Sequence, residues 1–279
     1  LQARMMTHTN QNQLMTQSLN ELNIVKNSIA KVLFLGYGKN QTKIIDALIS
    51  ENCSVWHSEE KIQTAKGFDL VVSFRYRHIL NKEIIHSSSA PIVNLHIAYL
   101  PYNRGAHPNF WSFYDGTPSG VSIHLIDEGI DTGPILFQKY VNFSDCEISF
   151  TQAYNRLIEE IENLFIDNLT AIVNKKYKAI PQRRKGTYHE LADLPKAFNG
   201  WGSIISDEII RLDSIAIESK YEKLLLIDEI EKIRNTNNVN WMDVLRLAFV
   251  HAPDKTKKLM KKINEEDSQI AELFRKLSK

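Results

Sequence analysis

The sequence has few cysteines, no large excess of charge and no long apolar run. Its two cysteines, Cys53 and Cys146, lie far apart and outside any Cys-x-x-Cys pattern, which argues against a disulfide framework or a zinc ribbon. A formal charge of +1 over 279 residues gives no global field that would attract nucleic acid or an anionic membrane. No segment approaches the roughly 18 consecutive apolar residues of a membrane span. We therefore expect a cytoplasmic protein that binds neither nucleic acid nor membrane.

The spacing of apolar residues predicts an α/β fold. Short apolar runs such as KVLFLG and FDLVVSF alternate with segments of helical spacing, which favours a mostly parallel, Rossmann-like sheet flanked by helices. After Tyr177 the chain becomes basic, aromatic and rich in turns, and from Asp207 onward its pattern is helical. We expect four parts: a disordered or helical leader (1–30), an α/β domain (31–177), a small hairpin or loop module (178–206) and a helical C-terminal appendage (207–279).

Two polar side chains interrupt the apolar strand in the stretch PIVNLHIAYLP. Alternate side chains of a strand share a face, so Asn94 and His96 project together while Val93, Leu95 and Ile97 face the other way. In an open parallel sheet, ligands bind beyond the carboxyl ends of the strands, and both polar residues lie toward that end. Taken alone, the pair is also consistent with two satisfied polar residues inside a sheet.

A second strand, GVSIHLI, leads into the glycine-containing loop DEGIDTGPI. Gly129, Gly133 and Pro134 fix a tight backbone path in this loop, and Asp131 lies among them. An acid held in this way is either a functional carboxylate or part of a solvated turn. The residues alone leave both interpretations open.

The run from Asn94 to Gln138 resembles the folate-dependent formyltransferases, the family of glycinamide ribonucleotide and methionyl-tRNA formyltransferases. It contains, in order, an Asn-x-His strand, a Leu-Pro turn, an Arg-Gly segment, a Gly-Val-x-Ile-His strand and an Asp-x-Gly-Pro loop. The likeness begins near Phe68. It implies that residues 31–177 form a formyltransferase catalytic domain, that N10-formyl-tetrahydrofolate is the co-substrate, and that no metal takes part. It also implies a catalytic trio of Asn94, His96 and Asp131.

The side chains of this trio suit formyl transfer. Asn94 can donate an N–H to the oxyanion of a tetrahedral intermediate. His96 can take the proton of the attacking amine or stabilise the oxyanion as an imidazolium. Asp131 can orient the imidazole or hold a relay water. The resemblance further points to folate contacts in the segment after the FDLVVSF strand, in the Arg-Gly turn and in the acidic loop, namely Tyr76, His78, Leu80, Arg104, Gly105, Asp127 and Gly129.

The stretch NLHIAYLPYNRGAHPNFW, together with RRKGTYHELADL, is similar to bacterial sugar N-formyltransferases, which act on amino sugars attached to a nucleoside diphosphate. This similarity implies an acceptor of that class, used for surface or flagellar glycan biosynthesis. Clustered arginines can neutralise a pyrophosphate, and aromatic rings can stack on a base. The predicted substrate-binding residues are Tyr102, His107, Asn109, Arg183, Arg184, Lys185, Tyr188 and Trp201.

Three other functions stay open at this stage. The chain can be a formyltransferase for another small amine, or a sensor that binds a nucleotide sugar without catalysis. A metal hydrolase would use His96, His107, His124 and Asp131, but this set lacks the compact spacing of known metal motifs. The C-terminal helices also leave a homodimer open.

Overall fold

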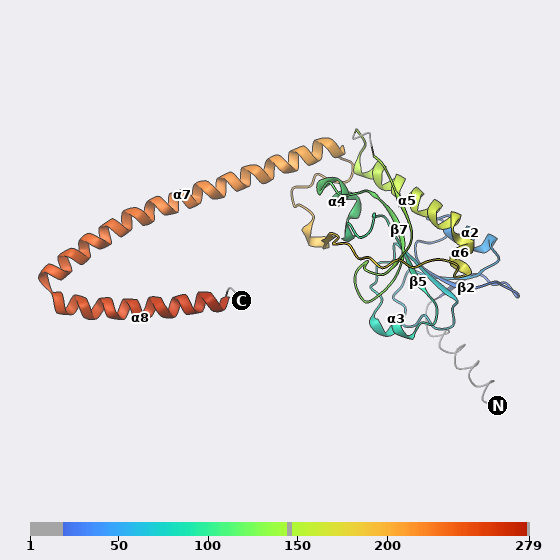
Figure 1. Cartoon of the computed structure of the whole chain (residues 1–279). Coiled ribbons are helices and arrows are strands. Elements are labelled where there is room, and N and C mark those ends of the chain that lie inside the picture. Colours follow the sequence, from blue (N-terminus) through green and yellow to red (C-terminus); the bar gives the residue numbers. More distant parts are fainter. Residues whose placement is uncertain (1–18, 144–146, 278–279) are drawn as a thin grey trace, which may run out of the picture. The chain divides into compact units, whose positions relative to one another are not determined.

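The computed structural model describes residues 19–143 and 147–277 and contains two compact units (Figure 1). The first unit ends at Leu212 and the second begins at Asp213. The expected start of the helical appendage, residue 207, therefore precedes the boundary between the units.

A seven-stranded sheet of order β1-β3-β2-β4-β5-β7-β8 forms the centre of the first unit. Four neighbouring strands, β3, β2, β4 and β5, run parallel, whereas β1, β7 and β8 join through antiparallel pairings. The predicted α/β fold is confirmed, although the sequence pattern did not indicate β8. The strands are β1 (Asn20–Asn23), β2 (Lys31–Gly36), β3 (Ser54–Ser58), β4 (Leu70–Phe74), β5 (Ile92–His96), β7 (Gly120–Leu125) and β8 (Ile135–Tyr140).

Helices cover both faces of this sheet (Figure 1). The long helix α5 begins at a capping box in which Ser149 and Gln152 satisfy each other's backbone N–H groups. Its apolar stripe, with Leu157 and Ile161, packs in one core with α2 and α6, whereas Ile84 of α3 packs in a second core. The helices of this unit are α2 (Ile44–Ser50), α3 (Lys82–Ser87), α4 (Pro108–Tyr114), α5 (Phe150–Asp167) and α6 (Leu169–Val173).

The module predicted for residues 178–206 is an extended loop that returns to the sheet. Ile180 forms an isolated bridge with Ile135. Further on, β9 (Tyr188–His189) pairs in parallel with the short strand β6 (Arg104–Gly105), and the 3-10 helix η1 (Leu191–Asp193) follows. Of the two expected forms, hairpin or loop, the structure shows the loop. It brings its residues against the turn that follows β5.

The prediction of a disordered or helical leader over residues 1–30 was wrong for the part that the structure describes. Strand β1 adds to the edge of the sheet by antiparallel pairing with β3. Asn23 supports this pairing because its side-chain amide donates to the Cys53 carbonyl at 3.0 Å. Cys53 is a buried free thiol, whereas residues 1–18 and Cys146 lie outside the described residues.

The second unit is helical, as expected from the sequence. Helix α7 (Ile205–His251) begins in the first unit, and α8 (Pro253–Leu277) follows after a break of one residue. Thr256 stabilises that break by donating its hydroxyl to the carbonyls of Ala248 and Ala252. In the described parts of the chain, no helix combines the length and apolarity needed to cross a membrane.

Candidate active site

Four polar side chains meet where β5, β7 and the loop after β7 come together, and we call them the Asp131 cluster: Asn94, His96, His124 and Asp131. Because β5 and β7 are antiparallel, Asn94 lies directly opposite His124 in the register of the sheet. Cross-strand pairs of this kind share a face. The loop after β7 then brings Asp131 to the same face, within hydrogen-bonding distance of the other members.

The Asp131 carboxylate is the centre of this cluster. Its Oδ1 accepts a hydrogen bond from Asn94 Nδ2 at 3.3 Å and lies 3.4 Å from His124 Nε2. Its Oδ2 accepts from the Gly105 N–H at 2.9 Å and lies 3.7 Å from His96 Nε2. Burial by itself would raise the pKa of this carboxyl. The two histidine rings and the Gly105 N–H outweigh burial and hold the pKa of Asp131 well below its usual range.

The backbone around Asp131 is fixed by close approaches that require glycine. At Gly133, an added Cβ would lie 1.8 Å from the Leu125 carbonyl oxygen. Gly105 has a φ of +85°, and its Cβ would lie 2.3 Å from the His189 carbonyl oxygen. The Asp131 carbonyl also accepts from the side-chain amide of Gln182 at 2.9 Å. The 178–206 module thus helps to hold the acid in place.

His96 is buried, and its protonation is set by a backbone acceptor. Its Nε2 lies 3.1 Å from the Asn103 carbonyl oxygen, which can only accept, so Nε2 carries the shared proton. A neutral ring then keeps a lone pair on Nδ1 and can act as a base. Asn103 is itself held firmly, since its backbone N–H donates to Thr187 Oγ1 at 2.7 Å and its side chain bonds to Thr117.

The side-chain amide of Asn94 lies beside two acceptors of the cluster. His124 Nδ1 donates to the Leu125 carbonyl at 2.8 Å, so in the neutral ring Nε2 is an acceptor, 3.2 Å from Asn94 Nδ2. Asn94 Nδ2, His124 Nε2 and Asp131 Oδ1 form a nearly equilateral triangle. The angle between the two acceptors at Nδ2 is much smaller than the angle between the two N–H bonds of a planar amide. One N–H shared between the two acceptors would leave the second N–H for a ligand.

A cavity of about 230 Å³ adjoins the Asp131 cluster, and we call it the Leu80 cavity. Its lining includes Asn94, His124 and Asp131 of the cluster. Arg104 and Gly105 are not in this lining: Arg104 bonds to Gln182, and Gly105 donates to Asp131. Five of the seven residues predicted to contact folate line the cavity, namely Tyr76, His78, Leu80, Asp127 and Gly129.

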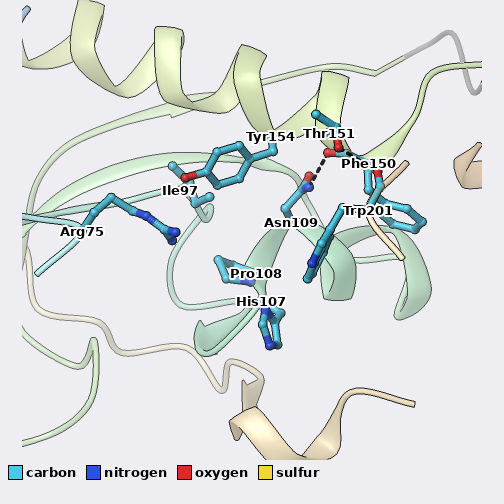
Figure 2. Close-up of a pocket in the computed structure, with 9 residues that line it drawn as sticks. All are labelled: Arg75, Ile97, His107, Pro108, Asn109, Phe150, Thr151, Tyr154 and Trp201. Carbon is cyan, nitrogen blue, oxygen red and sulfur yellow. Dashed lines mark hydrogen bonds between the residues drawn. The ribbon is translucent and has the colours of Figure 1, made fainter. Parts of the chain in front are cut away.

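A second cavity, of about 390 Å³, contains three of the predicted substrate-binding residues, His107, Asn109 and Trp201, and we call it the Trp201 cavity (Figure 2). The rings of His107 and Trp201 lie 5.2 Å apart. Asn109 is buried and donates its amide to the Phe150 carbonyl at 2.8 Å, but its Oδ1 has no hydrogen-bond partner among the described residues. The lining residues are Arg75, Ile97, His107, Pro108, Asn109, Phe150, Thr151, Tyr154 and Trp201.

The other predicted substrate-binding residues lie elsewhere. Arg183, Arg184 and Lys185 have exposed side chains, and none of them lines the Trp201 cavity. Tyr188 is half exposed, and its ring packs against Gly105. Tyr102 follows the cis Leu100–Pro101 peptide bond and is likewise outside that cavity.

The metal-site alternative is not assembled in the described parts of the chain. His107 lines the Trp201 cavity, whereas His96, His124 and Asp131 belong to the Asp131 cluster. Among the described residues, no group of three or more histidine, cysteine, aspartate or glutamate side chains has a geometry suited to a metal ion.

Sequence reasoning missed two residues that shape the Asp131 cluster. His124 was considered only as a metal ligand, although it lies at the end of the Gly-Val-x-Ile-His strand. Its position beside Asn94 depends on the antiparallel register of β5 and β7, which the sequence does not display. Gln182 bonds to the carbonyls of both Asp131 and Gly133, and no motif indicated it.

Comparison with known proteins shows which proteins this chain resembles. Residues 57–169 match the family described as formyl transferase. A dTDP-4-amino-4,6-dideoxyglucose formyltransferase from Mycobacterium tuberculosis is 32% identical over 137 residues, which are 49% of this chain and 57% of that protein. A methionyl-tRNA formyltransferase from Thermodesulfovibrio yellowstonii is 36% identical over 126 residues, 43% of this chain and 39% of that protein. The chain thus spans less than three fifths of the length of each of these curated relatives.

A solved structure is similar over more of its length. The formyltransferase PseJ from Anoxybacillus kamchatkensis, in complex with UDP-4,6-dideoxy-4-formamido-L-AltNAc and tetrahydrofolate, superimposes with a TM-score of 0.59. It is 35% identical, and the alignment covers 63% of this chain and 96% of that one. The motifs, the Asp131 cluster, the family match and this structural likeness all agree, and the chain belongs to the formyl transferase family.

Proposed function

We propose that this protein is an N-formyltransferase that moves the formyl group of N10-formyl-tetrahydrofolate to the amine of a nucleoside-diphosphate-linked amino-deoxy sugar. The observation that carries the proposal is the convergence of Asn94, His96 and Asp131 on one face of β5. This face adjoins the Leu80 cavity, and Ile97, the residue after His96, lines the Trp201 cavity. Asn94 and Asp131 therefore line a candidate site for the folate, and the chain directly after His96 leads to a candidate site for the sugar.

The cluster supplies the groups that the transfer needs. His96 takes the proton of the sugar amine as the amine nitrogen bonds to the formyl carbon. Asn94 donates its second N–H to the oxygen that becomes negative in the tetrahedral intermediate. The ionised Asp131 supports His96 as the ring becomes positive. When the bond between carbon and N10 breaks, His96 returns the proton to N10, so that the products are the formamide and tetrahydrofolate.

The Leu80 cavity is suited to the pterin ring of the folate. Leu80 and Ile126 provide apolar wall, while Asp127 and the backbone of the loop that follows provide polar groups. Asp127 is held in place because its Oδ1 accepts from Thr132 Oγ1 at 2.5 Å and from the Gly129 N–H at 3.1 Å. Such a lining can grip a flat heterocycle that has hydrogen-bonding edges.

The acceptor class is supported by the relatives whose names state a substrate or ligand. One is named for a dTDP-linked 4-amino sugar, and the solved neighbour is in complex with a UDP-linked 4-formamido sugar and tetrahydrofolate. Both ligands join a nucleoside diphosphate to a sugar that carries nitrogen at the same carbon. We extend this class to the present chain, with surface or flagellar glycans as the destination of the product.

A mass-spectrometric assay tests the function. The protein is incubated with N10-formyl-tetrahydrofolate and a panel of UDP-, dTDP- and GDP-linked amino sugars, and each sugar is examined for the mass increase of one carbonyl group. We expect one sugar to gain this mass and the His96→Asn variant to show almost none. Binding of folate without transfer to any sugar in the panel would contradict the acceptor class. Binding of a nucleotide sugar without transfer would favour the sensor.

A further inference from the structure

Arg75 occupies an unusual position at the end of β4. It follows directly on the last strand residue and adopts a left-handed backbone conformation with a φ of 60°. Its guanidinium carbon lies 5.9 Å from the ring centre of Tyr37 and 5.4 Å from that of Tyr154. The two tyrosine hydroxyls are hydrogen-bonded to each other at 3.0 Å. Two linked aromatic rings therefore hold the guanidinium, and Figure 2 shows it beside Tyr154.

The guanidinium of Arg75 forms no hydrogen bond and no ion pair with any of the described residues. Two other arginines of the first unit are paired: Arg104 donates to Gln182, and Arg211 forms an ion pair with Glu208 at 2.6 Å. Tyrosine faces fix the position of a cation without using its N–H groups. The full donor fork of Arg75 is thus positioned and available to a ligand.

The surroundings of Arg75 indicate on which side an anion would bind. Among the nine residues that line the Trp201 cavity, all within the described chain, Arg75 alone carries a fixed charge. Arg75 also lines a neighbouring cavity of about 500 Å³, where Glu59 and Glu60 offset the charges of Arg75 and Arg77. The described lining of the Trp201 cavity contains no acidic side chain to balance the charge of Arg75, so we expect an anion to bind on this side.

A second feature of the Trp201 cavity also points to a ligand. Asn109 is 2% exposed, and its Oδ1 is a buried acceptor without a partner among the described residues. Leaving such an atom unpaired is costly, so its retention is best explained by a ligand that brings an N–H or O–H donor. A nucleotide sugar carries such donors on its base and its sugars, together with two linked phosphates.

We propose that Arg75 binds the diphosphate of the nucleotide-linked sugar in the Trp201 cavity, while Asn109 Oδ1 accepts a hydrogen bond from an N–H or O–H of the same ligand. This inference rests on the proposed function and specifies how its acceptor is held. The planar fork of arginine matches pairs of phosphate oxygens. Arg75 thereby takes the role that the sequence suggested for Arg183 and Arg184.

Calorimetric titration of the full chain tests this assignment. UDP, dTDP and GDP are compared with uridine, thymidine and guanosine for the wild type, Arg75→Gln, Arg75→Lys and the neighbouring control Arg77→Gln. We expect Arg75→Gln to weaken binding of the preferred diphosphate by on the order of 10- to 100-fold, with nucleoside affinity unchanged. Arg75→Lys should restore part of the loss, because it keeps the charge without the fork. Arg77→Gln should bind like the wild type.

Several outcomes would overturn the assignment. If Arg75→Gln keeps the wild-type preference for the diphosphate over the nucleoside, the diphosphate lies elsewhere, and formyl transfer by the wild type still upholds the proposed function. If Arg75→Gln raises the KM for N10-formyl-tetrahydrofolate instead of that for the sugar, the cation serves the folate. If the wild type binds no diphosphate in the panel, the assignment of Arg75 fails, whereas the formyl-transfer assay decides the proposed function separately. Should Arg75→Gln not fold, undiminished diphosphate binding by Arg75→Lys would count against a role for the fork.

Discussion

The Asp131 cluster and the Trp201 cavity differ in how their polar groups are paired. In the cluster, Asp131 is bonded or close to Asn94, His96, His124 and a backbone N–H, and its pKa is lowered as a result. In the cavity, the Arg75 fork and a buried amide oxygen have no partner among the described residues. A group that must act during the reaction is oriented in advance, whereas a group that binds a ligand is left for that ligand to complete.

This contrast predicts that substitutions in the two regions affect different kinetic constants. Removing an interaction that forms only in the transition state lowers kcat, whereas removing one that holds the substrate throughout raises KM. Changes in the Asp131 cluster should therefore lower kcat at nearly constant nucleotide affinity. Changes in the Trp201 cavity should mainly raise the KM for the sugar.

The largest effect is expected for His96→Asn. Loss of the general base should lower kcat by roughly 10²- to 10⁴-fold, while the KM for the nucleotide sugar stays within a small factor of the wild-type value. His57→Asn is a matched control, because His57 is also buried and its Nε2 bonds to a backbone carbonyl, that of Gly36, at 2.9 Å. Steady-state kinetics with both substrates gives the comparison. A loss of activity in both variants to the same degree would indicate a structural role only.

Asn94→Ala should have the next largest effect. Removal of one oxyanion donor typically lowers kcat by roughly 10²- to 10³-fold. The control is Asn23→Ala, since Asn23 is also half-buried but donates to the Cys53 carbonyl at the far edge of the sheet. If Asn94→Ala instead raised KM at constant kcat, the Asn94 amide would bind the substrate in the ground state. The predicted difference between substitutions in the Asp131 cluster and in the Trp201 cavity would then be wrong.

Most of the fold could be predicted from the sequence, because the apolar pattern of each strand or helix lies within one short segment of the chain. Continuous apolar runs correspond to β2 and β4, which are buried on both faces, and the alternation in β5 separates Val93 and Leu95 from Asn94. Strand β1 was missed because a short edge strand with polar residues carries no periodic signal. Its place is set by pairing with β3, a contact between segments distant in the sequence.

Site residues could be predicted from the sequence only where they belong to one motif. Asn94, His96 and Asp131 could be proposed because their types and order resemble those of a family. His124 and Arg75 could not be proposed in this way, since the role of each depends on a neighbour from another element. His124 lies beside Asn94 of β5, and Arg75 lies over the ring of Tyr154 of α5. For the basic run at Arg183, composition alone does not locate a phosphate site, because an exposed loop favours charge whether or not it binds phosphate.

A smaller effect, on stability, is expected for Asp131→Asn. The folded-state pKa of Asp131 is lowered, so its stabilisation is fully present above the unfolded value of about 3.9 and is lost as the pH falls toward the folded value. Asp131→Asn should therefore lower the free energy of unfolding at neutral pH by about 2 kcal/mol. It should also flatten the acid side of the stability curve. Urea unfolding from neutral pH into the acid range measures both.

The exposed pair of Asp46 with Lys39 provides the control for this experiment. Asp46 is 61% exposed, and an ion pair in solvent contributes little to stability. Asp46→Asn should leave the acid side of the curve close to that of the wild type. If Asp131→Asn and Asp46→Asn gave the same curve, the hydrogen bonds and charges around Asp131 would not contribute to the free energy of unfolding. The proposed difference between the Asp131 cluster and the Trp201 cavity would then be contradicted.

The smallest effect is expected for the combined change Arg183→Gln and Arg184→Gln. All three arginines are exposed, but Arg183 and Arg184, unlike Arg75, lie outside the Trp201 cavity, where solvent screens their attraction for a phosphate. The KM for the nucleotide sugar should rise by no more than about fivefold, well below the effect of Arg75→Gln under the same conditions. Kinetics at two salt concentrations separates general attraction from a specific contact. A rise equal to that of Arg75→Gln, and insensitive to salt, would move the diphosphate to the 178–206 module.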